Sequence, residues 1–245
     1  MKIKQKRVLS AVILLLILLL LALLGWKWLS GRQAEEMIQE SAPPVADVPQ
    51  TSEYVSPVDF SGLQNQNKDI YAWIRIPDTC VDYPIVQRTE DNSYYLRRDI
   101  AGEWAYHGSI FTENYNTLTF EDPITVVYGH NITAGRMFGD LKDYSDQEYF
   151  NTHNQMTIYL PTEEKHYTLV AAVPFDDRHL LYKADYTDAE VYRALVNELL
   201  SVRDLNAVIA GGAEISEKDR LVILSTCYYN IKSKRYLVIW KETEE

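Results

Sequence analysis

The sequence predicts a mainly β domain that follows an N-terminal membrane anchor and a polar linker. Short runs rich in Val, Ile, Tyr and Phe recur along residues 58–245 and are separated by Gly, Pro, Asn and Asp, as β-strands are separated by turns. Only one long segment spaces its apolar residues as a helix does. Residues 58–245 suffice for one domain with a full core, and they contain no internal repeat.

Residues 1–30 predict a cytoplasmic tail and a transmembrane helix. Four basic residues come first, and an apolar stretch of about 22 residues then runs from Val8 to Leu29, long enough to cross a hydrocarbon core of ~30 Å. The basic cluster favours a cytoplasmic N-terminus, with Trp26 and Trp28 at the outer interface. A cleaved signal peptide fits less well because the apolar core is long and the sequence around Gly25 is a poor cleavage site. We therefore expect a single-pass protein of the cell membrane whose remaining chain is extracellular.

Residues 31–57 form the predicted linker, and the acidic charge of the chain beyond the anchor argues against nucleic-acid partners. The linker is polar, contains four prolines and has no sustained periodicity. The whole chain has a formal charge of −11, and leaving out the five basic residues among 1–30 gives −16 outside the membrane. So acidic a surface repels phosphates, which argues against nucleic-acid binding.

The elements of the domain follow in order from turn and capping signals. Asp59 is expected to start a short helix over 59–68. Capping-box spacing at Ser145 predicts another short helix, and the same spacing at Thr187 predicts a helix of about four turns that continues through Leu200. The strands are expected at 71–76, 81–86, 124–128, 156–160, 167–173, 221–227 and 235–240.

The last two strands carry the most informative residues. If the connection between them is symmetric about Ile231, Cys227 and Arg235 lie opposite each other, with Cβ atoms about 5 Å apart. A cation at that distance lowers the pKa of a thiol, and Arg stays charged at every relevant pH. A lone Cys in a strand is often buried and inert. However, Cys227 ends its apolar run beside polar residues, in the setting that reactive thiols occupy.

An acyl-transfer enzyme with a thiol nucleophile also needs a general acid, normally a His. The histidines at 107, 153, 166 and 179 all lie in polar or mixed segments, where a surface His needs no explanation. His130 follows the strand at 124–128, and Gly129 between them permits a sharp turn that exposes the ring. A His after a strand also has an ordinary structural interpretation.

Several ordered motifs resemble those of the sortases, the cysteine transpeptidases of Gram-positive cell surfaces, and class B is the most similar. The resemblance extends from Asp69 to Trp240. It rests on Tyr128-Gly129-His130-Asn131, Met137-Phe138-Gly139-Asp140-Leu141, Leu224-Ser225-Thr226-Cys227 and Arg235-Tyr236, together with the segments at 76–79, 81–87, 91–96 and 108–111. At Ile223 the family more often has Thr, which is also β-branched.

The resemblance implies an eight-stranded β-barrel with a few helices, in which a helix before the last two strands marks class B. It assigns His130 as general acid/base, Cys227 as nucleophile and Arg235 as the arginine that stabilises the transition state. It further places five substrate-binding candidates along the groove: Asn92, Leu96, Ser225, Thr226 and, less directly, Tyr182.

The implied substrate is a secreted protein with a C-terminal sorting signal similar to Leu-Pro-x-Thr-Gly or Asn-Pro-x-Thr-Asn, cut after Thr. The implied acceptor is an amine of a peptidoglycan crossbridge or a pilin lysine, and no cofactor is expected. Two alternatives stay open, a membrane-anchored cysteine endopeptidase and a non-catalytic β-barrel binding module. In the second, Cys227 is buried or forms a disulfide with Cys80, the only other cysteine. Neither thiol has the spacing of a zinc site, so no metal is expected.

Overall fold

The computed structural model describes residues 54–132, 135–229 and 231–243, with Ile17, Leu21, Leu23 and Gly25. The chain divides into two compact units, Met1–Ser41 and Ala42–Glu245, and the elements below belong to the second. The predicted anchor at 1–30 and most of the linker at 31–57 lie outside the described residues, and both stay predictions. Among the residues that are described, no helix is both long and apolar enough to cross a membrane.

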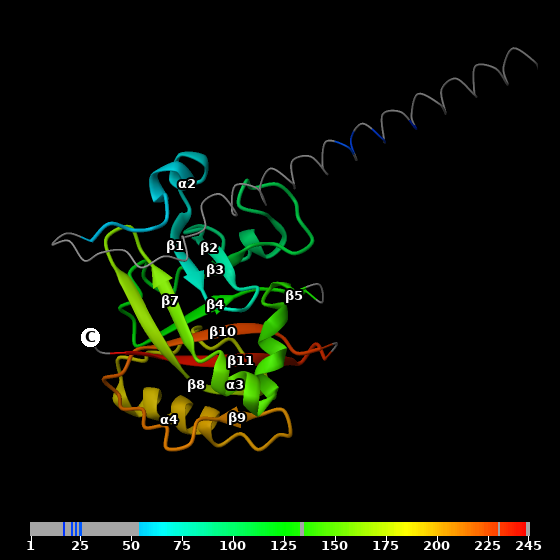
Figure 1. The fold of residues 1–245 in the computed structure, drawn as a ribbon. Coiled ribbons are helices and arrows are strands. Elements are labelled where there is room, and N and C mark those ends of the chain that lie inside the picture. Colours follow the sequence, from blue (N-terminus) through cyan, green and yellow to red (C-terminus); the bar gives the residue numbers. More distant parts are fainter. Residues whose placement is uncertain are drawn as a thin grey trace, which may run out of the picture. The chain divides into compact units, whose positions relative to one another are not determined.

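Eight strands close into a barrel, as the resemblance implied (Figure 1). Around the barrel the order is β11, β10, β4, β3, β2, β1, β7 and β8, and β8 pairs again with β11 to complete the circle. The bounds are β1 Ile70–Arg75, β2 Asp82–Gln87, β3 Ile110–Thr112, β4 Ile124–Tyr128, β7 Gln155–Tyr159, β8 Glu164–Asp176, β10 Leu221–Cys227 and β11 Lys234–Glu242. Outside the barrel, β9 (Val208–Ile209) extends the sheet along β8, and β5 (Asn131–Ile132) pairs with β6 (Arg136–Met137).

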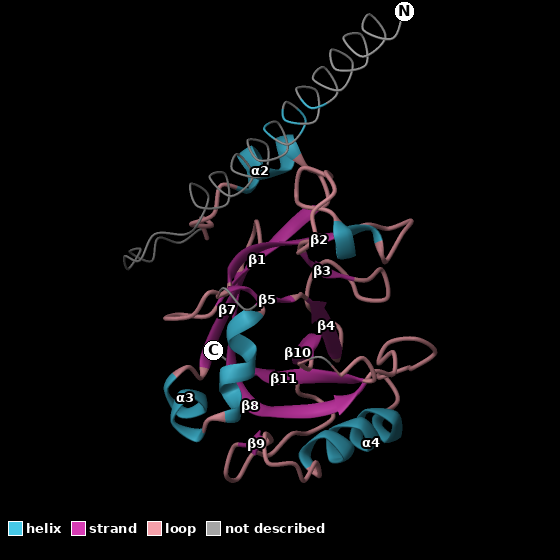
Figure 2. Cartoon of the chain, turned by 90° about the vertical axis from the view of Figure 1, so that its right-hand side faces the viewer, coloured by secondary structure: helices cyan, strands magenta, loops and turns pink. Residues whose placement is uncertain are grey.

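Both faces of β10 and β11 are buried, because the barrel interior lies on one side and α4 (Ala189–Leu200) covers the other. Val222 and Val238 belong to the interior cluster, which draws on every strand of the barrel. Leu221 and Ile239 belong to the outer cluster with α4. Figure 2 shows α4 lying along this part of the sheet. Each fully buried aliphatic side chain contributes about 1.5–3 kcal/mol, so the hairpin is firmly held from both faces.

The α-helices of the described domain occur where they were expected, but two of them begin one residue later than predicted. The N-cap of α3 (Gln147–Thr152) is Asp146 instead of Ser145, and the N-cap of α4 is Asp188 instead of Thr187. In both, one carboxylate accepts two backbone N–H groups, and its charge also favours the helix N-terminus. The Thr187 hydroxyl instead donates to Asp185 at 2.6 Å.

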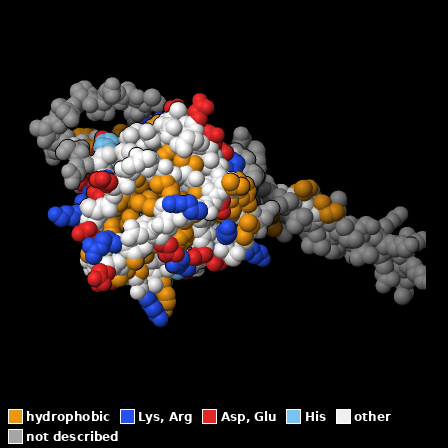
Figure 3. Space-filling view, turned by 90° about the horizontal axis from the view of Figure 1, so that it is seen from below, with side chains coloured by type: hydrophobic (Ala, Val, Ile, Leu, Met, Phe, Trp, Pro, Cys, Tyr) orange, Lys and Arg blue, Asp and Glu red, His pale blue; other side chains and the backbone are white. Residues whose placement is uncertain are grey.

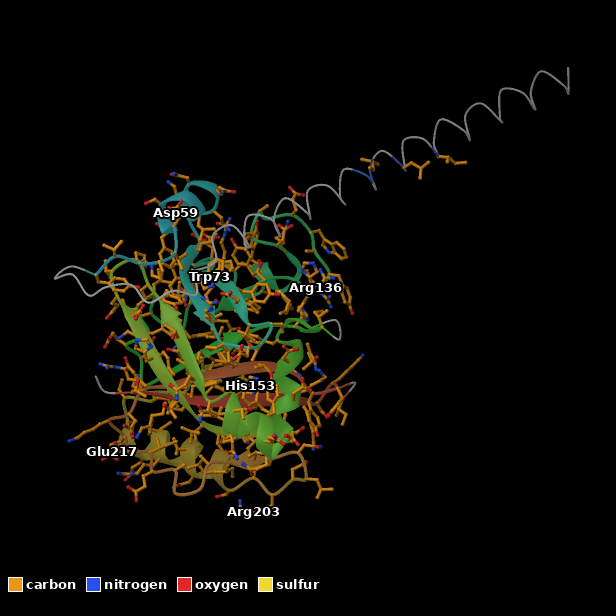
Figure 4. The ribbon with its side chains drawn as sticks, in the orientation of Figure 1. Asp59, Trp73, Arg136, His153, Arg203 and Glu217 are labelled. Carbon is orange, nitrogen blue, oxygen red and sulfur yellow. The ribbon has the colours of Figure 1, made fainter. Side chains whose placement is uncertain are left out.

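The remaining helices lie at two other places in the fold. Asp59 caps α2 (Phe60–Gln66) as predicted, at the end of the domain opposite Arg203 (Figure 4). Two 3-10 helices, η1 (Tyr94–Arg97) and η2 (Gly139–Ser145), precede and follow the segment that carries His130. Seen from the side of α4 and β9, basic and acidic side chains alternate around apolar patches (Figure 3), so this surface has no region of a single sign.

Candidate active site

The end of the β10–β11 hairpin has the predicted register. Cys227 is the direct partner of Arg235, and Ser225 is the partner of Leu237. Because side chains alternate along a strand, Ser225, Cys227, Arg235 and Leu237 all face the outer side of the barrel, away from Val222 and Val238. The hairpin therefore presents a thiol and a guanidinium on one surface.

His130 reaches the same edge because β4 and β10 run parallel. Tyr128 is the register partner of Ser225, and the Gly129 N–H donates to the Ser225 carbonyl at 3.2 Å. His130 and Cys227 each lie two residues beyond this matched pair, so they leave the sheet at the same edge. The Asn131 side-chain amide then donates to the Cys227 carbonyl at 3.2 Å, which joins the two segments.

Gly129 is required for a reason other than the predicted turn. Its φ is not among the positive values in the domain. A Cβ at this position would lie 2.6 Å from Ile110 Cδ1 and 2.6 Å from Phe138 Cδ2. The glycine is therefore needed because two buried side chains pack directly against the backbone that precedes His130.

The His130 ring is half-buried, and one of its nitrogens is hydrogen-bonded. Its Nε2–H donates to the Leu96 carbonyl at 2.8 Å, so the neutral ring keeps its lone pair on Nδ1. Burial holds the pKa of His130 below its usual value, and the nearby charges of Arg97 and His107 act in the same direction. The hydrogen bond to Leu96 opposes this shift. The ring can thus exchange a proton through Nδ1 while Nε2 fixes its orientation.

Among the described residues, no carboxylate neutralises the Arg235 guanidinium. Its Nη1 donates to the carbonyls of Lys232 and Lys234, both at 3.1 Å. Within the described part of the chain, no Asp or Glu forms an ion pair with it. Two backbone carbonyls orient the group and leave its full positive charge available to an anion on the groove side.

Nearly all of the predicted catalytic and substrate-binding residues line one groove of about 290 Å³. Its lining includes the three predicted catalytic residues and four of the five substrate-binding candidates: His130, Cys227, Arg235, Asn92, Leu96, Ser225 and Thr226. Tyr182 is not part of this lining; it is 53 % exposed and makes edge-to-face contacts with Tyr115 and His179. Thr226 is the weakest of the four, since strand alternation turns its side chain toward the barrel interior.

Asn92 already has a structural partner at the rim of the groove. Its Nδ2 donates to Asn114 Oδ1 at 3.0 Å, and its Oδ1 accepts from the Asn114 backbone N–H at 2.8 Å. This reciprocal pair holds two loops together beside the groove. Asn92 thus shapes the rim even before any ligand is considered.

Sequence reasoning missed a Glu–His pair in the same groove. Glu113 follows β3, and its Oε2 lies 2.8 Å from Nε2 of His179. The Nδ1 of His179 accepts the backbone N–H groups of Leu181 and Tyr182, which places the ring proton on Nε2. Burial raises the pKa of the Glu113 carboxyl, against the opposing effects of His179 and Tyr128. One signal in the sequence could have pointed to Glu113: it is a charged residue directly after a buried strand. His130 lies in a similar position, two residues after β4.

The two cysteines are both free, so the alternative of a disulfide between Cys80 and Cys227 is wrong. Cys80 is half-buried, and its Sγ lies 3.4 Å from the Met137 carbonyl oxygen that accepts its hydrogen bond. Burial raises the pKa of the Cys80 thiol to about 12. Cys227 is exposed at the groove. Only one of the two thiols is therefore placed to react with a bound molecule.

Comparisons with known proteins agree with this geometry. The Sortase domain family model matches residues 74–243. Sortase B of Listeria monocytogenes is 34 % identical over 168 residues, a match that covers 67 % of this chain and 65 % of that protein. Sortase B of Staphylococcus aureus is 29 % identical over 191 residues, covering 77 % of this chain and 76 % of that protein. The chain thus spans just under two thirds of the length of the Listeria relative.

Solved structures extend the similarity to the whole barrel. Sortase B of B. anthracis, in complex with AAEK1, has a TM-score of 0.72 at 26 % identity and covers 89 % of this chain and 98 % of that one. A Staphylococcus aureus sortase B–substrate complex has a TM-score of 0.67 at 28 % identity, covering 78 % and 87 %. A Streptococcus pyogenes class B sortase involved in pilus biogenesis has a TM-score of 0.63 at 28 % identity, covering 76 % and 98 %.

Proposed function

The chain belongs to the sortase family and is of the class B type, and from this premise we propose that it is a cysteine transpeptidase. It cleaves a C-terminal sorting signal of secreted proteins after Thr and joins the new carboxyl end to a cell-wall amine. The observation that carries the proposal is the meeting of an exposed thiol, a half-buried imidazole and an unneutralised guanidinium in one groove.

The first half of the reaction forms a thioester. The Cys227 thiolate attacks the carbonyl carbon of the Thr in the sorting signal, and the carbonyl oxygen becomes an oxyanion. The Arg235 guanidinium stabilises this charge, a contribution of about 3 kcal/mol for a single well-placed donor. Protonated His130 then gives its proton to the nitrogen of the departing peptide, the C–N bond breaks, and Cys227 holds the Thr carboxyl as a thioester.

The second half transfers the acyl group to an amine. His130, now neutral, takes a proton from the incoming amine as its nitrogen attacks the thioester carbon. The oxyanion forms again beside Arg235, and it collapses with release of the Cys227 thiolate. The products are an amide bond and the original enzyme. An acceptor that is a peptidoglycan crossbridge amine or a pilin lysine satisfies this chemistry equally.

The groove supports binding of the sorting signal as an extended segment. Leu96 offers an exposed apolar surface at one wall, Ser225 lies two residues from the nucleophile on the same face, and the Asn92–Asn114 pair borders the entrance. Tyr182 contributes from outside the groove, as part of the aromatic group with Tyr115 and His179. A similar structure, a Staphylococcus aureus sortase B–substrate complex, supports a substrate-binding groove in this chain.

The proposed location follows from the same chemistry. Secreted substrates and cell-wall amines are both outside the cell, so the catalytic domain acts at the outer face of the membrane. The anchor predicted over 1–30 keeps it there, with the N-terminus in the cytoplasm.

The test is amide exchange by the full-length protein. We expect peptides that end in sorting signals to be cut after Thr and joined to an added primary amine, as read by mass spectrometry. Cys227→Ala abolishes both steps, while Cys80→Ala serves as the matched control and retains them because its thiol points into the protein. Release of free acid regardless of the amine would instead identify an endopeptidase. Wild-type turnover by Cys227→Ala would refute the assigned nucleophile.

A further inference from the structure

The turn between α4 and β9 contacts the catalytic hairpin from behind. Within this turn, at residues 201–207, the Asn206 N–H donates to Asp204 Oδ1 at 3.0 Å and the Ala207 N–H donates to the Asp204 carbonyl at 3.1 Å. The turn is anchored at both ends, by the C-cap Ser201 of α4 and by the pairing of β9 with β8. Figure 4 shows it at the edge of the domain where Arg203 is labelled.

Asn206 bonds to both strands of the hairpin. Its Nδ2 donates to the Tyr228 hydroxyl at 2.6 Å, and the Tyr236 hydroxyl donates to its backbone carbonyl at 2.9 Å. The two tyrosine rings stack on each other with centroids 5.8 Å apart and planes 15° apart. One residue thus connects the end of β10 to the beginning of β11.

A second contact from the same turn reinforces the first. Asp204 Oδ2 lies 4.0 Å from Lys234 Nζ, and this ammonium lies 5.8 Å from the centroid of the Tyr228 ring. We refer to Asp204 and Asn206, with Tyr228, Lys234 and Tyr236, as the hairpin clamp. All of its contacts lie on the turn side of the hairpin and leave the groove free.

The hairpin clamp acts where the backbone ladder is weak. Tyr228 directly follows Cys227, and Tyr236 directly follows Arg235. Beyond Cys227, the Tyr228 N–H reaches the Lys234 carbonyl only at 3.4 Å, and Tyr229 has a φ of 47°. Side-chain contacts therefore replace strand pairing at the point where the nucleophile and the guanidinium must be held apart at a fixed distance.

We propose that Asn206 is a positioning residue, which fixes the separation of the Cys227 sulfur and the Arg235 guanidinium from the opposite side of the hairpin. That this separation matters for turnover rests on the function proposed above. The contacts of Asn206 with Tyr228 and Tyr236 do not depend on that function. Asn206 touches no group that reacts. It acts through the two tyrosines that follow the catalytic residues.

The first experiment measures transpeptidation by full-length Asn206→Ala. We expect kcat to fall about tenfold with KM unchanged, since a displacement of 1 Å in a reacting group costs up to about 100-fold. The Tm stays close to that of the parent because the Tyr236 bond goes to the backbone carbonyl, which the substitution retains. Asn206→Asp restores kcat, since the Tyr228 hydroxyl can donate to the new carboxylate. Leu205→Ala is the control from the same turn, where the side chain is 100 % exposed.

The second experiment needs no substrate. The rates at which anionic iodoacetate and neutral iodoacetamide alkylate Cys227 are compared at one pH, at the tryptic peptide that contains Cys227 and separates it from Cys80. In Asn206→Ala the ratio of the iodoacetate rate to the iodoacetamide rate falls, because the Arg235 cation is no longer held beside the sulfur to attract the anionic reagent. Tyr228→Phe, which keeps the ring stack and removes only the hydroxyl, lowers this ratio in the same way, and the double variant adds nothing further.

The outcomes separate the two proposals. A lowered ratio of alkylation rates in the variants, without any transpeptidation in the parent protein, would refute the proposed function and support the hairpin clamp. Parental kcat and an unchanged ratio in both Asn206→Ala and Tyr228→Phe would overturn the positioning role. If Asn206→Ala lowers the Tm markedly, Tyr228→Phe decides the question alone: a lowered ratio supports the proposal and an unchanged one overturns it.

Discussion

The two ends of the β10–β11 hairpin differ in the partners of their cationic side chains. At the end far from the groove, Lys165 is 7 % exposed, and its Nζ lies 2.5 Å from Glu121 and 3.2 Å from Glu242. Arg220, just before β10, pairs with the same two carboxylates. At the groove end, Arg235 has two backbone carbonyls and, within the described residues, no carboxylate. Strand β11 carries both Glu242 and Arg235.

The difference separates stability from function along a single strand. A buried cation without a partner is strongly destabilising, so Lys165 requires its carboxylates. Arg235 is only half-buried and can remain without a counterion at little cost, because water still solvates it. An Asp or Glu beside Arg235 would neutralise the charge that the proposed oxyanion needs. Ion pairs therefore stabilise the hairpin at the far end, whereas at the groove end the charge of Arg235 remains available to a bound anion.

The largest expected effect comes from Arg235→Ala at the groove end. We expect kcat for amide exchange to fall by about 10²–10³, the loss typical of one donor to an oxyanion. The free energy of unfolding falls by only about 1 kcal/mol, since the substitution removes two hydrogen bonds of a half-buried side chain and, among the described residues, no ion pair. Steady-state kinetics and urea unfolding measure the two quantities. Near-parental turnover, or a large loss of stability, would contradict the idea that the groove end serves function and the far end serves stability.

The next effect in size comes from Lys165→Met at the far end. Its removal leaves Glu242 and Glu121 without their buried cation, and we expect a loss of about 2–3 kcal/mol in the free energy of unfolding. This is below the usual 3–5 kcal/mol for a broken buried pair because Glu121 is 45 % exposed.

Urea unfolding measures this loss, and kcat per folded molecule should not change. Lys218→Met is the matched control, as Lys218 borders the same surface and forms no ion pair among the described residues. Equal stability of the two variants would contradict a structural role for the far end.

The smallest effect is a shift in proton affinity at the groove. The charge of Arg97 contributes to holding the pKa of His130 below its usual value, so Arg97→Gln should raise that pKa. Burial is the larger cause, and the pKa of His130 therefore stays below the usual value in the variant. At a fixed pH near neutrality, the protonated fraction of His130 increases. An NMR titration of the ring measures the shift, with Arg193→Gln on α4 as the control. A downward shift would contradict the assigned electrostatics.

Local sequence patterns predicted the parts of the fold that depend on neighbouring residues. The register that pairs Cys227 with Arg235 follows from a short connection between two apolar runs, and α4 follows from its spacing of apolar residues. The capping errors at Ser145 and Thr187 have a common cause. Each residue precedes an Asp, and the carboxylate is the stronger acceptor for the first turn of the helix.

Contacts between distant segments were not predictable in this way. The parallel pairing of β4 with β10 joins runs about a hundred residues apart, and only the family resemblance implied that His130 and Cys227 meet. Glu113 and His179, like Asn206 and Tyr228, are pairs whose members look ordinary in their own segments. Nothing in either segment specifies its partner, because the barrel brings them together.

Strand β11 pairs with β10 on one side and with β8 on the other, and it also carries Arg235. Until β11 adds, two open sheet edges remain and the thiol has no guanidinium opposite it. The pairing that closes the barrel therefore also places Arg235 opposite Cys227. If the proposed transpeptidation is correct, a folding intermediate in which β11 has not yet paired is expected to be inactive, because its thiol and guanidinium are not yet opposite each other.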